Sequence, residues 1–407
     1  MPTLLQINFT CNSGSTGKIA EQIGNLAIET GWKSYFAYSR GTANSTSNII
    51  RIGNKLNVFW HGLETRIFDN HGLASRIATK RFVSKIEEIK PDIIHLHNIH
   101  GYYLNYQILF DFLKKYNHPV VWTLHDCWAM TGHCAYFSMA NCNKWKKQCF
   151  DCSLKKDYPK SLFFDNAKQN YHNKKVAFQG VNNLHIVSVS NWLNNIVKES
   201  YLNYANLHVI YNGIDIKMFK PLDSQKMKLE YNLNNKKILL GVANVWEKRK
   251  GLADYVELRK KISKDFVIVL IGLDKKIIKS LPEGIIGISR TENQRQLAQW
   301  YSLADIVLNL SYQESFGLTT VEGFACGTPS IVYNTTASPE LISDDTGLIV
   351  EPGNISQLVD AIKAKCSKPL KSDNCRQRAE QFYDKNVSYQ KYLDLYNKLL
   401  SKYKTNQ

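Results

Sequence analysis

The chain has 407 residues, of which 44% are apolar, and it carries a formal charge of +17 at pH 7. This length exceeds the size at which one hydrophobic core keeps growing, so two domains are expected. No stretch reaches the roughly eighteen consecutive apolar residues of a membrane span, and residues 1–5 show neither a basic region nor a cleavage site. These features favour a cytoplasmic protein over one that crosses a membrane with helices.

The excess of Lys and Arg predicts an acidic partner. Nucleic acid is not expected, because the chain has no basic helix with interleaved aromatic residues and no zinc-finger spacing. An anionic membrane surface attracts lysine clusters, and one short stretch contains Lys144, Lys146, Lys147, Lys155, Lys156 and Lys160. A membrane contact and a merely solvated basic surface both remain open.

Short apolar runs alternate with longer amphipathic segments, the pattern of parallel sheets covered by helices on both faces. In the first half, the predicted strands are 4–8, 34–38, 93–96, 120–124, 186–188 and 209–211. In the second half, they are 238–242, 266–271, 285–288, 306–310, 330–333 and 348–350. Two doubly wound α/β domains are therefore expected.

A glycine-rich loop follows the first predicted strand and opens a helix. It contains Gly14 and Gly17, and Lys18 after the second glycine suggests a phosphate loop of the Walker A type. That motif requires a Gly where this chain has Asn12 and a Ser or Thr where it has Ile19. Nucleotide hydrolysis is not expected here, but the glycines would let backbone approach a donor or an acceptor.

Histidines cluster after two predicted strands. His95 and His97 share one face of an extended strand, whereas His100 lies beyond its end, so a three-histidine metal site is not favoured. His125 follows strand 120–124, at the carboxyl edge of a sheet, where ligands of α/β proteins bind.

Nine cysteines in a cytoplasmic protein are expected to be reduced thiols. Cys149 and Cys152 have the two-residue gap of structural zinc sites, and Cys134 with Cys142, or His133, could complete a tetrahedral set. The seven-residue gap between Cys134 and Cys142 is not a standard zinc spacing, and free cysteines are often simply buried. A structural zinc and a set of buried thiols both remain open, while Cys127 is expected in the core.

Two carboxylates, Glu314 and Glu322, stand eight positions apart around a Ser-Phe-Gly turn that feeds a predicted helix. The first amides of that helix, which begins near Leu318, would bind phosphate. An acid at the mouth of the turn and another on the helix could grip hydroxyl-bearing groups on both sides of a diphosphate. A nucleotide sugar has this layout.

This segment resembles the signature of the retaining glycosyltransferases of family 4, which have the GT-B fold. The Glu-x7-Glu run precedes a Cys-Gly-Thr-Pro turn, and residues 333–342 and 346–353 are further family-type segments in the expected order. The resemblance implies two Rossmann-like domains that face a cleft. The first, residues 1–219, is an acceptor-side domain with a Cys-rich insertion at about 127–160. The second, residues 220–385, binds the nucleotide sugar. A final helix, residues 386–407, returns to the first domain.

The resemblance also implies roles for individual residues. His125 and Glu314 are the expected catalytic residues. Lys250 matches the lysine placed on the pyrophosphate, but the family arginine upstream is Asn244 here, so Arg249 or Arg290 could supply the second positive charge. The expected donor-binding residues are Gly14, Gly17, Asn244, Arg249, Lys250, Phe316, Gly317, Leu318, Thr319 and Glu322.

The implied activity is metal-independent, retaining hexosyl transfer from a nucleoside diphosphate sugar to a glycan or a lipid-linked glycan. The resemblance is to enzymes of colanic acid and capsule biosynthesis, which implies peripheral work at the inner face of the cell membrane. No cofactor is expected for catalysis. Two alternatives remain: a GT-B nucleotide-sugar epimerase, and a basic nucleic-acid-binding protein with an inactive cleft.

Overall fold

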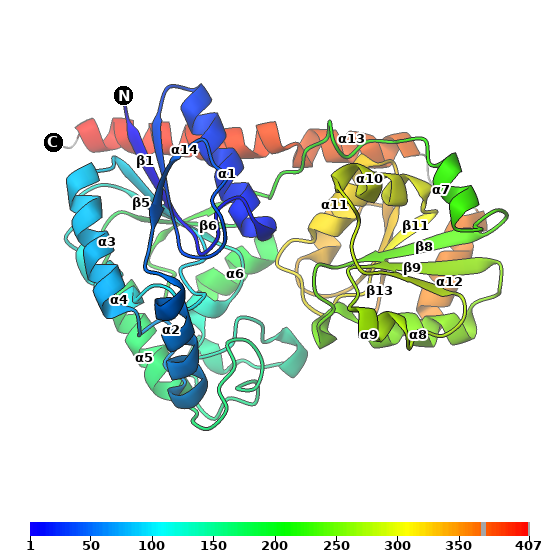
Figure 1. The fold of residues 1–407 in the computed structure, drawn as a ribbon, viewed down its shortest axis with the longest axis horizontal. Helices are drawn as coiled ribbons and strands as arrows, with labels where there is room; N and C mark the ends of the chain where they lie inside the picture. Colours follow the sequence, from blue (N-terminus) through cyan, green and yellow to red (C-terminus); the bar gives the residue numbers. More distant parts are fainter. Residues whose placement is uncertain (368–371, 406–407) are drawn as a thin grey trace. The chain divides into compact units, whose positions relative to one another are not determined.

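The computed structural model describes residues 1–367 and 372–405. Contacts within the chain divide it into two units (Figure 1). Unit 1 comprises Met1–Ile210 together with the chain from Tyr389 onward, and unit 2 comprises Tyr211–Ser388. No helix among the described residues combines the length and the apolar character needed to cross a bilayer.

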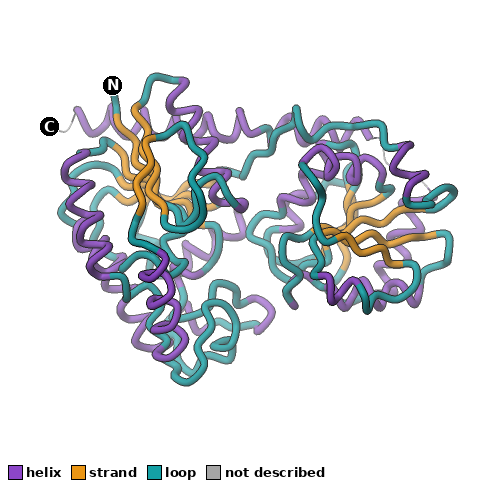
Figure 2. Tube along the Cα trace, viewed as in Figure 1, coloured by secondary structure: helices purple, strands orange, loops and turns teal. Residues whose placement is uncertain are grey.

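Unit 1 is built on a seven-stranded parallel sheet, drawn in orange in Figure 2. Its strands are β1 (Thr3–Ile7), β2 (Lys33–Tyr38), β3 (Asn48–Arg51), β4 (Ile93–Leu96), β5 (Val120–Leu124), β6 (Leu184–Ser188) and β7 (Asn206–Val209). The order across the sheet is β3-β2-β1-β4-β5-β6-β7. The central strands β4 and β5 are buried along their whole length, as expected for a sheet covered on both faces.

Helices connect these parallel strands. They are α1 (Gly14–Glu29), α2 (Lys55–Phe68), α3 (Arg76–Ile89), α4 (Tyr106–Leu113), α5 (Ala167–Phe178) and α6 (Asn191–Glu199). The Cys-rich segment between β5 and α5 forms no α-helix or strand. It has three short 3₁₀ turns, η1 (Trp128–Met130), η2 (Ser138–Ala140) and η3 (Lys144–Lys146).

The final helix, α14 (Lys385–Thr405), returns to unit 1, as predicted. Its helically spaced apolar residues join a core cluster with α1 and the central strands of the unit 1 sheet. Tyr396 Oη lies 2.6 Å from His95 Nδ1, and Thr123 Oγ1 donates to Tyr392 Oη at 3.2 Å. The buried face of α14 is therefore fixed by polar as well as apolar contacts.

Unit 2 has a six-stranded parallel sheet of order β10-β9-β8-β11-β12-β13. Its strands are β8 (Lys237–Val242), β9 (Phe266–Ile271), β10 (Ile285–Ile288), β11 (Ile306–Asn309), β12 (Ser330–Tyr333) and β13 (Gly347–Val350). The helices are α7 (Gln225–Glu230), α8 (Leu252–Lys261), α9 (Lys275–Ile278), α10 (Gln294–Leu303), α11 (Leu318–Ala325), α12 (Ile355–Ser367) and α13 (Ser372–Tyr383). Two Rossmann-like units confirm the predicted fold class.

Three details differ from the sequence predictions. Strand β3 was not predicted, and the strand expected at 209–211 is wrong, because β7 ends at Val209. Residues 211–219 were assigned to the first domain but belong to unit 2. The physical reason is local pairing: Ile214 bridges to Asp384, and Lys385 Nζ donates to Asp215 at 2.7 Å.

Candidate active site

The order of strands in unit 2 reverses between β8 and β11. From β8 the sheet grows through β9 to β10 on one side, and from β11 through β12 to β13 on the other. At such a switch point the loops leaving the two carboxyl ends diverge and open a crevice, where α/β proteins bind ligands. The loop after β8 carries Lys250 and the loop after β11 carries Glu314, so both predicted residues lie at this edge.

Lys250 and Glu314 form an ion pair across the switch point. Lys250 Nζ donates to Glu314 Oε1, and the two side chains are only 16% and 12% exposed. Burial alone raises the pKa of the Glu314 carboxyl, but the charge and the hydrogen bond of Lys250 lower it, and the net pKa lies below the usual value. Glu314 is therefore ionised at neutral pH beside the cation expected to hold phosphate.

The position of Lys250 depends on a close approach of two backbones. Lys250 ends the 3₁₀ turn η4 (Lys248–Lys250), and Gly251 follows with a φ of 70°. A Cβ at Gly251 would lie 2.1 Å from the carbonyl oxygen of Leu310. Tyr312 N–H donates to the Arg249 carbonyl at 2.8 Å, which joins the same two loops a second time. Only glycine fits this position.

The neighbouring cations occupy different environments. The Arg249 guanidinium donates to Glu247 Oε2 at 2.8 Å and to the Gln313 carbonyl at 3.3 Å, so it braces the two loops. Asn244, which stands where the family has an arginine, is exposed, and so is Arg290. Which residue supplies a second positive charge to the donor stays a prediction.

Helix α11 begins where the sequence predicts. Gly317 precedes it with a φ of 105° and no side-chain cap, so Leu318 and Thr319 form a first turn whose N–H groups have no partner within the helix. Phe316 is buried and its ring packs near those of Tyr211 and Tyr383. This packing fixes the turn that presents the helix N-terminus.

Glu322 lies one turn into α11 and is held by a residue that sequence reasoning missed. Tyr301 Oη, fully buried on α10, donates to Glu322 Oε2 at 2.8 Å. The contact orients the carboxylate on the helix. No local signal in the sequence links two residues that belong to different helices.

Unit 1 has its own set of predicted residues at the carboxyl edge of its sheet, where the strand order reverses between β1 and β4. Gly17 faces the Thr10 carbonyl oxygen so closely that a Cβ would lie 2.9 Å from it, whereas a Cβ at Gly14 would meet open space. Both glycines belong to α1, directly after the loop that leaves β1.

His125 follows β5 and is partly exposed. Its Nε2 lies 3.3 Å from Nδ1 of His97, whose Nε2 lies 3.1 Å from Gln6 Oε1. Burial lowers the pKa of His125 to about 4, against a smaller opposing effect of Asp126. The imidazole is therefore neutral at pH 7 and can act as a hydrogen-bonding group rather than as a cation.

The other histidines do not gather as metal ligands. His95 bonds to Thr123 and Tyr396 in the core, and His100 Nε2 pairs with Asp126 Oδ2 at 2.9 Å. Within residues 1–367 and 372–405, no three His, Cys, Asp or Glu side chains stand together as a group that could hold a metal.

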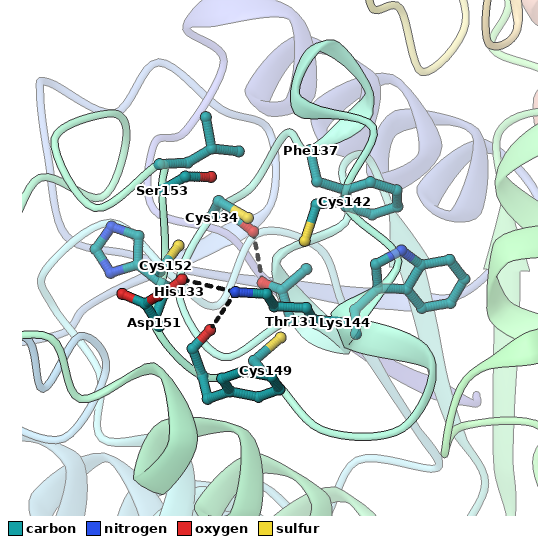
Figure 3. A pocket seen from close by; sticks show the side chains of 13 residues that line it. Thr131, His133, Cys134, Phe137, Cys142, Lys144, Cys149, Asp151, Cys152 and Ser153 are labelled. Atoms are coloured by element: carbon teal, nitrogen blue, oxygen red, sulfur yellow. Dashed lines mark hydrogen bonds between the residues drawn. The ribbon is translucent and has the colours of Figure 1, made fainter.

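The Cys-rich segment nevertheless brings the four predicted cysteines to one place. Cys134, Cys142, Cys149 and Cys152 line a single cavity of about 20 Å³, together with His133 (Figure 3). Cys134 and Cys152 are hydrogen-bonded to each other through their side chains. The cysteines share a cavity without the side-chain arrangement of a metal site, so the structural zinc stays a prediction. Cys127 is buried, as expected.

Comparisons with known proteins identify the family. The model described as Glycosyltransferase Family 4 matches residues 43–217, and the model described as Glycosyl transferases group 1 matches residues 223–382. The chain is 21% identical over 413 residues to the putative colanic acid biosynthesis glycosyl transferase WcaC of Escherichia coli, covering 97% of this chain and 100% of that protein. The chain belongs to the family 4 glycosyltransferases.

Solved structures of this glycosyltransferase fold agree. Sucrose-phosphate synthase from Thermosynechococcus elongatus matches with a TM-score of 0.73 at 16% identity, covering 99% of this chain and 100% of that one. Anabaena HepE, solved with UDP-glucose, matches with a TM-score of 0.67 at 15% identity, covering 97% and 99%. Together with the two Rossmann-like sheets, these likenesses show that the glycosyltransferase has the GT-B fold.

Proposed function

We propose that this glycosyltransferase moves a hexose-type sugar, with retained anomeric configuration, from a nucleoside diphosphate sugar to a glycan or lipid-linked glycan in bacterial surface polysaccharide biosynthesis. The observation that carries the proposal is the Lys250–Glu314 pair at the β8/β11 switch point, beside the N-terminus of α11. The colanic acid role named for WcaC and the UDP-glucose bound by HepE support the substrate class.

The donor would be held by its charge and its hydroxyl groups. Lys250 and the first amides of α11 would meet the diphosphate, because a helix N-terminus and an ammonium both favour anions. Glu322, which Tyr301 orients, would accept hydrogen bonds from the ribose hydroxyls. On this proposal, the protein itself supplies the positive charge that a metal ion supplies in other enzymes.

The transfer step follows from these positions. The bond between the anomeric carbon and the diphosphate oxygen breaks, and the nucleoside diphosphate leaves with the electron pair. Positive charge develops on the sugar, and the ionised Glu314 stabilises it. The acceptor hydroxyl attacks the same face of the sugar and gives its proton to the departing diphosphate oxygen. His125, neutral at pH 7, would hydrogen-bond a sugar hydroxyl.

A screen of nucleotide sugars by thermal shift tests the proposal first, because a ligand that binds only the native state raises its stability. The selected donor is then incubated with glycan acceptors, and the anomeric configuration of the product is determined by NMR. Transfer with retention is the expected result. Conversion of the nucleotide sugar without transfer would favour the epimerase, and salt-sensitive retention of DNA or RNA without donor binding would favour a nucleic-acid-binding protein.

A further inference from the structure

Helix α2 has its apolar side exposed and its polar side buried, the reverse of a helix on a water-soluble protein. Leu56, Phe59 and Trp60 lie on one face of the helix, at the i, i+3 and i+4 spacing, and are 66%, 62% and 62% exposed. The same stripe continues through Leu63 and Ile67, which are half-buried. The helix, labelled α2 in Figure 1, thus has its apolar side exposed.

The face of α2 that points inward is polar, and hydrogen bonds hold it there. His61 and Thr65 are buried. His61 Nε2 accepts from Gly72 N–H at 3.1 Å, and its Nδ1 lies 2.9 Å from Ser75 Oγ. A capping box at Asn54 fixes the start of the helix. The orientation of α2 is therefore specified by its own contacts.

The apolar surface extends beyond the end of α2. The rings of Phe68 and Phe164 stack at 6.1 Å, and both residues are half-exposed. Leu162 N–H donates to the Arg66 carbonyl at 2.8 Å, and the neighbouring Phe163 is 68% exposed. Full burial of one such side chain is worth about 1.5–3 kcal/mol, so a surface this rich in large apolar residues indicates a binding function.

Exposed cations lie on the elements next to the start of α2. A groove of about 830 Å³ runs beside the start of α2 and along α3, and its lining includes Arg51 and Arg81, together with Lys85, which is ion-paired with Glu88. Arg76 lines the adjacent hollow together with Glu64 of α2. Aromatic and aliphatic side chains flanked by exposed cations are the combination that binds the interface of an anionic bilayer.

We propose that the outer face of α2 with residues 162–164, here called the α2 face, docks on an anionic lipid bilayer. Phe59 and Trp60 insert at the headgroup level, and lipid headgroups occupy the groove lined by Arg51 and Arg81. The inference rests on the proposed function only for its biological reason, a lipid-linked acceptor.

The α2 face differs from the lysine cluster predicted from the sequence. In that cluster, Lys146 is ion-paired with Glu199, and Lys144 donates to the carbonyls of Phe150 and Asp151 at 3.0 and 2.9 Å. The cluster also lacks a helix with an exposed apolar stripe, since η3 is a single 3₁₀ turn.

The position of Trp60 supplies a direct probe. All eight tryptophans lie in the described part of the chain. Trp60 alone is exposed, and the other seven are buried or half-buried. Vesicles of phosphatidylglycerol and phosphatidylcholine should shift its fluorescence to shorter wavelength, and vesicles of phosphatidylcholine alone should shift it much less. Trp60→Phe should remove the shift while keeping co-sedimentation with the anionic vesicles.

Three variants complete the test. Phe59→Ser with Trp60→Ser should lower partitioning into anionic vesicles at least tenfold, about 1.4 kcal/mol, whereas Leu229→Ser, equally exposed at 62% on α7, should not change it. Arg76→Glu with Arg81→Glu should weaken binding and flatten its salt dependence. A far-UV circular dichroism spectrum like that of the wild type shows that each variant is folded.

Three outcomes overturn the proposal. Vesicles could leave the fluorescence of Trp60 unchanged, or the double serine variant could partition like the wild type. The wild type could also be a dimer and the double serine variant a monomer, which would mean that a second copy covers the α2 face. The vesicle assays contain no nucleotide sugar, so their failure is separate from a failure to observe sugar transfer.

Discussion

Lys250 donates to Glu314 across 64 residues of sequence, and the bond joins the loops that leave β8 and β11. The cation proposed to hold the diphosphate and the carboxylate proposed to face the sugar are thus already in contact. Their charges cancel at the place where the anionic donor would bind. The pair sets the geometry of the site and couples the two residues energetically. Their roles can still be distinguished, because each is proposed to contact a different part of the donor.

Lys250→Ala should weaken binding of the nucleoside diphosphate whose donor the thermal-shift screen selects. The expected loss is the roughly 1.5–3 kcal/mol typical of a charged hydrogen bond. Glu314→Ala should leave that affinity within a few-fold of the wild type, because the sugar is the only part of the donor that the carboxylate is proposed to contact. Its loss should fall on kcat, since the charge on the sugar develops in the transition state. Calorimetric titration beside transfer rates measures both effects.

Lys248→Ala is the matched control, because Lys248 is exposed in the same 3₁₀ turn. It should bind the diphosphate like the wild type. If Lys248→Ala and Lys250→Ala weakened binding equally, the turn would act only through its general positive charge, and the phosphate contact assigned to Lys250 would be wrong.

Glu322→Ala should weaken the nucleoside diphosphate by about 1.5–3 kcal/mol if the carboxylate binds the ribose. The same substitution should have little effect on the 2′,3′-dideoxy analogue, which lacks the hydroxyls. Tyr301→Phe should weaken the ribose form by less, because it removes only the group that orients Glu322. Equal losses for both analogues with Glu322→Ala would show that the carboxylate acts elsewhere.

The pH dependence of stability should reflect His125. Burial lowers its pKa from 6.5 to about 4, so the unfolded chain takes up the proton before the native protein does. The contribution of neutral His125 to the free energy of unfolding is fully present above about pH 6.5 and is lost as the pH falls from 6.5 toward 4. The urea midpoint of the wild type should fall over this window.

His125→Gln, which cannot be protonated, should lose less stability over the same window. NMR of the imidazole, assigned by comparison with this variant, should show a neutral ring at pH 5.5. A protonated His125 at pH 6 would refute the assignment of a neutral hydrogen-bonding role.

Protein purified without chelator should contain near-stoichiometric zinc if the four cysteines around the cavity of Figure 3 bind it. Cys149→Ser should then lower the zinc content and the thermal stability together. Cys11→Ser should keep the zinc, because Cys11 is buried outside this segment. Wild-type protein without zinc in elemental analysis would leave the cysteines as packed thiols.

The sequence predicted the parts of the fold that depend on continuous burial. Strands such as β5 and β9 are long apolar runs, and their signal is local. Strand β3 lies at the sheet edge with both Asn48 and Arg51 exposed, so it carries no apolar run. The pattern was therefore insufficient at the two edges of the unit 1 sheet, where β3 was missed and the strand at β7 was misplaced.

The candidate site divides in the same way. Glu314, Gly317 and Glu322 belong to one local motif, and their relation to the α11 N-terminus follows from the helical start that the motif encodes. The Lys250–Glu314 pair and the Tyr301–Glu322 bond join residues far apart in the chain. Such contacts arise from strand order and helix packing, which no local spacing specifies.

The approach of Gly251 to the Leu310 carbonyl has a consequence for mutational scanning of this enzyme. Gly251 has no side chain with which to touch a substrate, yet any substituent there must displace the loop that carries Lys250. A saturation scan should therefore find position 251 as intolerant of substitution as Lys250 and Glu314. Gly251→Ala should behave almost like Lys250→Ala. Intolerance at this position would report the spacing between two loops rather than a chemical group in the reaction.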